Sequence, residues 1–312
     1  MSQIAFTLTH SGTMPNPFSY VEETTQFGAL DSSPTLLATK ITKDIRPKID
    51  DNEIEVRQVG SHLLYGQQTS GHTYGLGLTT NPFDLPFLKY GSEPPNYTTP
   101  TGTSARSLSF VLRYKQSTGT IGQVDYYLKF LGFKFNTLEL SVSSQGLAEA
   151  TSELMGREIA IPTATAISGA TWPTFGSITS PALSNVDGGN KPLTIGATQY
   201  AVKDWRNQWN NNLIIDQFSG SGLADAITVG GIEITGSFNT PTGQDLTQET
   251  AMHDFPQVET TFKYIVKNGT MVVNGTGFKL LGDTPEGFSA GPTATNQHVY
   301  NYKCISAGLG TS

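Results

Sequence analysis

The sequence predicts an all-β protein with one or two short helices, built from a duplicated unit. Three observations predict this class. Charged residues make up 14% of the 312 residues, where ~25% is usual, and Thr, Ser, Asn, Gln and 33 glycines take their place. Apolar and polar residues alternate in several short runs, as they do in half-buried strands. Part of the first half of the chain also recurs in the second half.

Composition along the chain suggests four segments. Residues 1–34 are rich in Thr, Pro, Ser and Gly, and we expect an N-terminal arm with little regular structure. Residues 35–160 form a first β unit in this interpretation. Residues 161–195 are dominated by small residues and proline, which favours a linker or extended loop, and residues 196–312 form a second β unit.

The strands of the first unit are predicted from residues that alternate between apolar and polar. Leu108, Phe110 and Leu112 stand at every second position, which places them on one face of a strand. The expected strands of this unit are Leu36–Ile41, Glu53–Val59, His72–Thr79, Ser107–Tyr114, Asp125–Phe135 and Thr137–Ser143.

Two segments of the first unit are candidates for helices. Asn81–Tyr90 can hold a short helix, although Pro86 limits its length. Leu147–Met155 is compatible with either a helix or a strand. The acidic run Asp50–Glu55 lacks the ligand spacing and the glycine of a calcium-binding loop, and we interpret it as a solvated turn that leads into a strand.

The second unit has its own series of strands. Asn268-Gly269 separates two alternating runs and predicts a β-hairpin, because both central residues of a type I′ turn need a positive φ. The expected strands are Tyr200–Trp205, Leu213–Phe218, Gly231–Phe238, Val258–Lys267, Met271–Leu280 and Val299–Ile305.

A shift of 160 positions aligns the second half of the chain with the first without gaps. Thr42–Ser61 and Val202–Ser221 share seven identities in twenty positions, among them a Lys-Asp-x-Arg sequence. Chance would give roughly one or two identities at ordinary composition. Farther along, Gly132-Phe133-Lys134 resembles Gly277-Phe278-Lys279. We interpret these matches as a tandem duplication of one β unit.

No pattern of catalytic, cofactor-binding or metal-ligating residues stands out. The five histidines lack metal-ligand spacing, and the single cysteine, Cys304, excludes an intrachain disulfide. His253-Asp254 resembles part of a catalytic dyad but has no nucleophile elbow beside it. We therefore expect no enzyme activity and no cofactor.

Charge and hydropathy limit the possible partners. The net charge is −7 with only 19 Lys and Arg, so binding through the phosphate backbone of a nucleic acid is not expected. An acidic surface that faces DNA without holding it fits this charge. The N-terminus lacks the features of a signal peptide, and no apolar run approaches the ~20 residues of a membrane helix, so we expect no membrane partner.

Several motifs occur in the order found in the tail tube (major tail) proteins of tailed phages, and the chain resembles this family over most of its length. Tyr20–Leu30 and Pro34 resemble the family's opening E-x-T-(x)-F-G-x-L-x-x-x-P. The other matching stretches are Glu53–Gln58, Phe83–Leu85, Phe130–Gly146, Leu154–Glu158, Asn210–Leu213 and Gly230–Phe238. The long Pro/Thr stretch Ser92–Thr103 departs from the family's pattern.

The resemblance implies a fold of two packed antiparallel sheets flanked by a short helix, with strands that join into a β-barrel between subunits. It also implies stacked rings that form a tube in the virion tail, assembled in the host cytoplasm. With two units per chain, a trimeric ring of pseudo-sixfold symmetry is favoured over a hexamer. The implied partners are other copies of the chain, a tape measure protein in the lumen, tail terminator and baseplate or tip proteins, and viral DNA in transit. The expected contacts between rings are Tyr20, Glu22, Glu23, Phe27 and Gly28.

Two other functions remain open from the sequence. A carbohydrate-binding or adhesive β-sandwich would use Trp205, Trp209 and the many tyrosines as contacts. A hydrolase on a β scaffold is a third hypothesis, and it lacks a recognisable set of catalytic residues.

Overall fold

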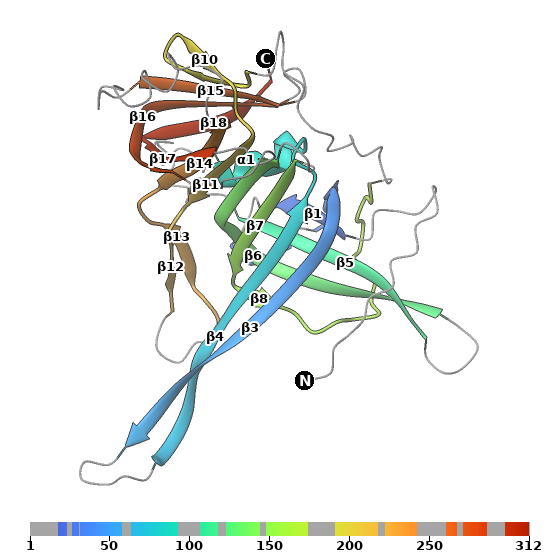
Figure 1. Cartoon of the computed structure of the whole chain (residues 1–312). Helices are drawn as coiled ribbons and strands as arrows, with labels where there is room; N and C mark the ends of the chain where they lie inside the picture. Colours follow the sequence, from blue (N-terminus) through green and yellow to red (C-terminus); the bar gives the residue numbers. More distant parts are fainter. Residues whose placement is uncertain are drawn as a thin grey trace, which may run out of the picture.

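The chain is built from antiparallel strands and one helix (Figure 1). A computed structural model describes residues 18–23, 27–30, 32–57, 64–92, 107–117, 123–143, 148–173, 191–217, 222–241, 260–266, 271–285 and 297–311. Within these residues sixteen strands belong to one branched sheet and two form a separate pair. The all-β prediction is confirmed.

The first unit places its strands in the order β2-β1-β5-β6-β7-β4-β3, with β8 also paired to β6. Its elements are β1 (Phe18–Glu22), β2 (Leu37–Ala38), β3 (Ile41–Arg57), β4 (Leu64–Thr80), α1 (Leu85–Ser92), β5 (Leu108–Ser117), β6 (Gln123–Ser143), β7 (Glu149–Gly156) and β8 (Glu158–Ile159). β3 and β4 form a long ribbon that extends away from the rest of the chain (Figure 1).

The second unit repeats this order as β10-β9-β15-β16-β17-β14-β11, with β18 also paired to β16. Its elements are β9 (Leu193–Ile195), β10 (Thr198–Tyr200), β11 (Asp204–Asn210), β12 (Leu213–Asp216), β13 (Ala226–Val229), β14 (Glu233–Pro241), β15 (Thr260–Val266), β16 (Met271–Pro285), β17 (Gln297–Cys304) and β18 (Ser306–Gly310). β12 and β13 follow β11 and β14 as a separate pair of strands. In the first unit the corresponding residues form the outer part of the β3–β4 ribbon.

The two units agree in register as well as in strand order. In the first unit Ile45 lies opposite Leu78. In the second unit Trp205 lies opposite Phe238, 160 residues later on both strands. The β12–β13 pairs fall on β3–β4 pairs after the same shift. The sequence shift therefore describes two copies of one backbone arrangement, while the predicted segment boundaries stay a prediction.

A β-bulge divides each of the two long strands β6 and β16 into halves. β6 has one residue more than β5 between the pairs that Leu108 and Phe110 form with it. β16 likewise has one residue more than β15 between the pairs of Thr260 and Phe262. Both bulges contain a glycine with positive φ, which residues with a side chain rarely adopt. The first half of each strand pairs in one layer and the second half pairs in another, so the bulged strand joins two packed sheets.

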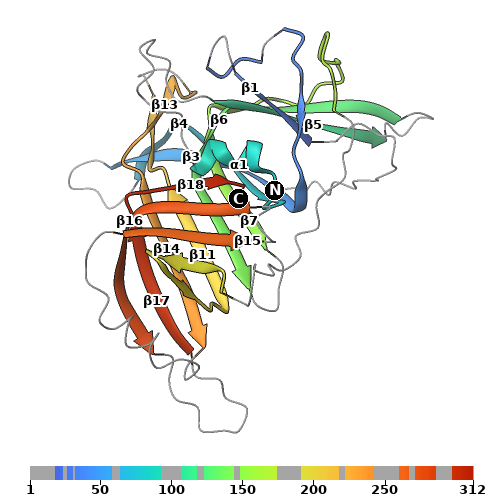
Figure 2. The same cartoon turned by 90° about the horizontal axis from the view of Figure 1, so that it is seen from above.

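The second half of β6 also joins the two units, because its free side pairs with β11. The result is a continuous path β3-β4-β7-β6-β11-β14-β17-β16, which we call the long sheet. Figure 2 shows β15 and the first half of β16 crossing over β11, β14 and β17 of this sheet. The end strands β3 and β16 do not pair with each other among the described residues, so one chain does not close a barrel.

Aromatic side chains fill the space between the layers of both units. In the first unit Phe18 stacks on Phe110, with ring centroids 5.4 Å apart. In the second unit Trp205 of the long sheet stacks on Tyr264 of the other layer, with centroids 4.2 Å apart. These rings are at most 2% exposed and contribute most of the buried apolar surface at each position.

The structure corrects one local prediction and decides between the two alternatives of another. The acidic run Asp50–Glu55 is not a turn, because it lies in the middle of the 17-residue strand β3 and only a bulge interrupts it. A partner strand of equal length compensates the low strand propensity of the acids. Leu147–Met155 contains a strand, β7, whose residues alternate in burial. The short helix is confirmed as α1, with Pro86 in its first turn, where a missing N–H costs nothing.

Candidate functional site

One face of the long sheet is open and polar. In β11 the alternation is regular: Trp205, Asn207 and Trp209 are buried under the second layer, whereas Arg206 and Gln208 point to the other side. β7 shows the same alternation. We call the side of the long sheet that carries Arg206 and Gln208 the open face. Strand periodicity alone did not locate this surface.

The open face carries charges of both signs in close pairs. Arg206 donates to Glu139 across the β6–β11 junction, with nitrogen and oxygen 2.5 Å apart. On β3, Lys48 lies 2.6 Å from Asp50. Three of these side chains are at least half exposed and Glu139 is partly exposed, so each pair contributes little to stability. Among the residues that the structure describes, this face has no concentration of positive charge that would hold a polyanion.

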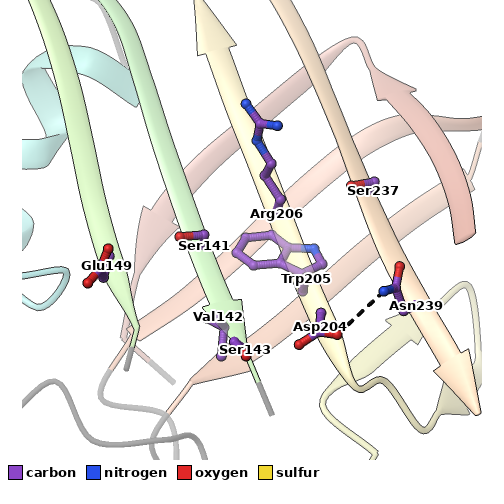
Figure 3. A pocket seen from close by; sticks show the side chains of 9 residues that line it. All are labelled: Ser141, Val142, Ser143, Glu149, Asp204, Trp205, Arg206, Ser237 and Asn239. Carbon is purple, nitrogen blue, oxygen red and sulfur yellow. Dashed lines mark hydrogen bonds between the residues drawn. The ribbon is translucent and has the colours of Figure 1, made fainter. Parts of the chain in front are cut away.

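A shallow pocket of about 460 Å³ lies on the open face where the two units meet. Figure 3 shows its side chains on four neighbouring strands, with Asp204 accepting a hydrogen bond from Asn239 at 3.4 Å. Its remaining residues are Ser141, Val142, Ser143, Glu149, Trp205, Arg206 and Ser237. Hydroxyl, amide and paired charged groups line this pocket, and they do not form a recognisable catalytic constellation.

The predicted contact residues divide into buried and half-buried ones. Tyr20 is 2% exposed and packs on Phe87, and Glu23 is 9% exposed. Glu22, Phe27 and Gly28 are half-buried. Their predicted role between rings stays a prediction, and within the chain Tyr20 and Glu23 belong to the interior.

Glu23 holds the loop after β1 against the sheet. One carboxylate oxygen accepts hydrogen bonds from Gly28 N at 2.8 Å and from the Ser107 hydroxyl. The other accepts from the Ser109 hydroxyl and from Gly132 N at 2.8 Å. Four donors satisfy this buried carboxylate, which lowers the cost of placing its charge in the interior.

Phe27 is held between two cations of the first unit. The Lys134 Nζ lies 5.7 Å from the ring centroid, and Arg157 lies over the same ring while donating to the Phe27 carbonyl oxygen. Burial lowers the pKa of Lys134 to about 8, and nearby Glu23 partly offsets this effect. Lys134 also donates to Ile227 O at 2.6 Å and so connects the two units.

The remaining candidates do not form a reactive site among the described residues. Burial raises the pKa of the Cys304 thiol to about 12, which keeps it protonated and unreactive at neutral pH. Nowhere in the described ranges do three or more His, Cys, Asp or Glu side chains gather to hold a metal ion. No helix in the same ranges is long and apolar enough to cross a membrane. His253-Asp254 lies outside the described residues.

The structure does not support the alternative of a tryptophan platform for sugars. Trp205 is 2% exposed, and Trp209 is fully buried with its indole N–H donating to Ala307 O at 2.9 Å. Both rings lie between the layers because their strand positions face the second layer. They cannot reach a glycan from there.

Repeated units, one continuous sheet and end strands whose outer edges have no partner among the described residues are typical of a structural protein whose sheet can be extended. The sequence confirms a particular family of this class: residues 17–299 match the phage tail tube protein family, and the chain belongs to it. No curated protein matches the chain. Membership of this family makes the protein a structural component of a virion tail.

Proposed function

We propose that copies of this chain assemble into stacked rings and that the stack is the tube through which viral DNA passes. The observation that carries the proposal is the long sheet, which has a covered face, an open polar face and two end strands whose outer edges have no partner within the described ranges. A closed barrel of such sheets removes the free edges and places the open face in the lumen. Paired charges on that face keep the lumen hydrated without binding phosphates.

Negative-stain microscopy of the purified chain tests this function. We expect rings or hollow tubes as protein concentration rises. A chain that stays monomeric across concentrations and salt conditions would contradict the proposal.

We further propose a ring of three chains with pseudo-sixfold symmetry. Each chain contains two equivalent units, and both contribute strands to its long sheet. Three chains would therefore place six units around the ring. Class averages of rings seen end-on count the chains directly. Six chains per ring would contradict the trimer.

We propose that the half-buried residues Glu22, Phe27 and Gly28 contact the next ring, while Tyr20 and Glu23 fix the shape of their loop. A Phe27→Ser chain should form rings that do not stack, which microscopy distinguishes from loss of rings. Normal stacking would remove this contact. The tape measure protein in the lumen and the terminator and baseplate or tip proteins at the ends are partners that such a tube would need, and co-assembly followed by sedimentation tests them.

A further inference from the structure

The junction between the two units is a template for a junction between chains. The second half of β6 pairs with β11 over seven residue pairs, from Thr137 opposite Asn210 to Ser143 opposite Asp204. This pairing joins the last strand of the first unit's sheet to the first strand of the second unit's sheet. Because the units share one backbone arrangement, each partner has a counterpart in the other unit.

The counterparts lie at the two ends of the long sheet. β3 corresponds to β11, and among the described strands it pairs with β4 alone. The second half of β16 corresponds to that of β6: Thr137 lies opposite Glu153, and Gly282 lies opposite Asn301 after the same kind of register shift. Within the described residues, Gly282–Pro285 pairs with β17 on one side only.

We propose that β3 of one chain pairs with the second half of β16 of a second copy, in the register of the internal junction. The inference rests on the proposed function, because it names the edges through which a ring closes. Internally, Gln208 lies opposite Glu139. Lys48 takes the place of Gln208 and Thr284 that of Glu139, so Lys48 and Thr284 face each other across the boundary between chains.

The apolar side chains of β3 are more exposed than those at the equivalent positions of β11, which has a partner strand on both sides. Ile49 is 53% exposed, whereas Trp209 at the equivalent position is 0% exposed. Ile45 is half-buried, whereas its equivalent Trp205 is 2% exposed. An exposed isoleucine on an unpaired strand edge promotes pairing with another chain. The second copy supplies the strand that β6 supplies to β11.

Two prolines mark the same edges. The hydrogen bond from Asn211 N to Asn136 O, at 2.8 Å, continues the β6–β11 ladder, so the N–H of alternate residues such as Asn207 points toward β6. Pro47 takes the place of Asn207, and Pro285 takes the place of the residue opposite it. Each proline therefore lacks an N–H on the side that faces away from its partner strand within the chain. Prolines of edge strands are found at such positions. The pair of prolines leaves one rung between chains without hydrogen bonds, so this junction is weaker than the internal one.

A cysteine pair tests the register. In a Cys304→Ser background, Lys48→Cys with Thr284→Cys should form a disulfide between chains on mild oxidation, because directly opposed residues of this kind have Cα atoms ~4.5 Å apart. Arg46→Cys with Thr284→Cys is the matched control, shifted by two residues on the same strand. Gln208→Cys with Glu139→Cys should close within a single chain. Denaturing gels without reductant then give a covalent ladder that ends at the number of chains in the ring.

The outcomes separate this inference from the proposed function. Rings in which the Lys48–Thr284 pair cross-links no better than the shifted control would overturn the edge pairing and leave the tube intact. Absence of rings from the unsubstituted chain would contradict the proposed function itself. A ladder from the Lys48–Thr284 pair and little from the control supports the pairing.

A single substitution checks the same edge without a disulfide. Ile49→Lys should leave the monomer folded, since the position is exposed, and should raise the concentration needed for rings at least about tenfold. Ile214→Lys is the matched control, because Ile214 is 54% exposed on β12 and lies outside the proposed edge. Equal ring formation by the two variants would overturn the inference.

Discussion

The two units have the same pairs of directly opposed residues, which we call rungs, but the side chains at these rungs differ. In the first unit Phe110 lies opposite Phe130, and at the equivalent rung Phe262 lies opposite Gly275. A Cβ on Gly275 would lie 2.0 Å from the Phe262 ring, so that ring occupies the space above the glycine. Backbone pairing is therefore preserved although the side-chain volume at this rung differs between the units.

At a second rung, side-chain volume is exchanged between the two opposed residues. Leu76 lies opposite Leu154 in the first unit, whereas Gly236 lies opposite Tyr302 in the second. A Cβ on Gly236 would meet the Tyr302 ring at 2.2 Å. Interiors are close-packed, so a change in one member of a rung requires a compensating change in the other.

The loops after the first strands differ more than the rungs do. In the second unit β9 and β10 are joined by Gly196 and Ala197, with Gly196 at φ 59°. In the first unit a longer loop separates β1 from β2, and Glu23 holds it in place. We expect Glu23→Ala to lower the free energy of unfolding by about 4 kcal/mol, because four buried donors lose a charged acceptor. Urea unfolding of the unassembled chain measures this effect.

Glu22→Ala is the control for that loss, because Glu22 is half-buried and accepts a hydrogen bond from the Tyr90 hydroxyl at 2.8 Å. Its expected cost is about 1 kcal/mol. Equal losses for the two variants would show that the loop does not depend on the buried carboxylate.

The exchange of volume within a rung can be reversed. Gly236→Leu should destabilise the chain by about 3 kcal/mol, because the new side chain overlaps the Tyr302 ring. Combining it with Tyr302→Leu restores the leucine pair of the first unit and should recover part of the loss. A double-mutant cycle in urea measures the coupling. Additive losses would contradict the idea that the two rungs are interchangeable.

The two bulges should respond alike. Gly132 and Gly277 have φ of 70° and 62°, and a Cβ at either position would lie within 3 Å of a neighbouring side chain. Alanine at each position should cost about 2 kcal/mol. Gly231→Ala, where a Cβ meets nothing within 4 Å, is the control and should change stability by less than about 0.5 kcal/mol. Thermal unfolding compares the three, and a neutral Gly277→Ala would show that only the first bulge is constrained.

The smallest expected effect is a pH dependence that belongs to the first unit. The folded chain lowers the pKa of Lys134 to about 8, so above that pH the unfolded chain binds more protons than the folded one. Stability relative to Lys134→Met should therefore rise by about 1 kcal/mol between pH 7.5 and 9. Using the difference between the two chains cancels the titration of Cys304 and the tyrosines. A difference that does not change with pH would contradict the burial of this ammonium group.

The strand class, the pairing of β15 with β16, the short helix and the duplication could all be predicted from the sequence, whereas the expected turn Asn268-Gly269 lies outside the described residues. Alternation within a strand follows from its period of two, and the shift of 160 residues holds because duplicated strands keep their register. Only the tertiary structure decided which face is covered. Asn207 is buried in the same row as Trp205, and Arg206 beside them faces solvent, because a second layer of strands distant in sequence covers one side only.

The tertiary structure also decided the roles of single residues. Glu23 is interior because Ser107, Ser109 and Gly132 come to it from strands that lie far along the chain. The β6–β11 junction likewise joins segments more than sixty residues apart, and no local pattern encodes such a pairing. Strand propensity and period are local properties, whereas the choice of a partner strand depends on the hydrogen bonds and packing of the whole sheet.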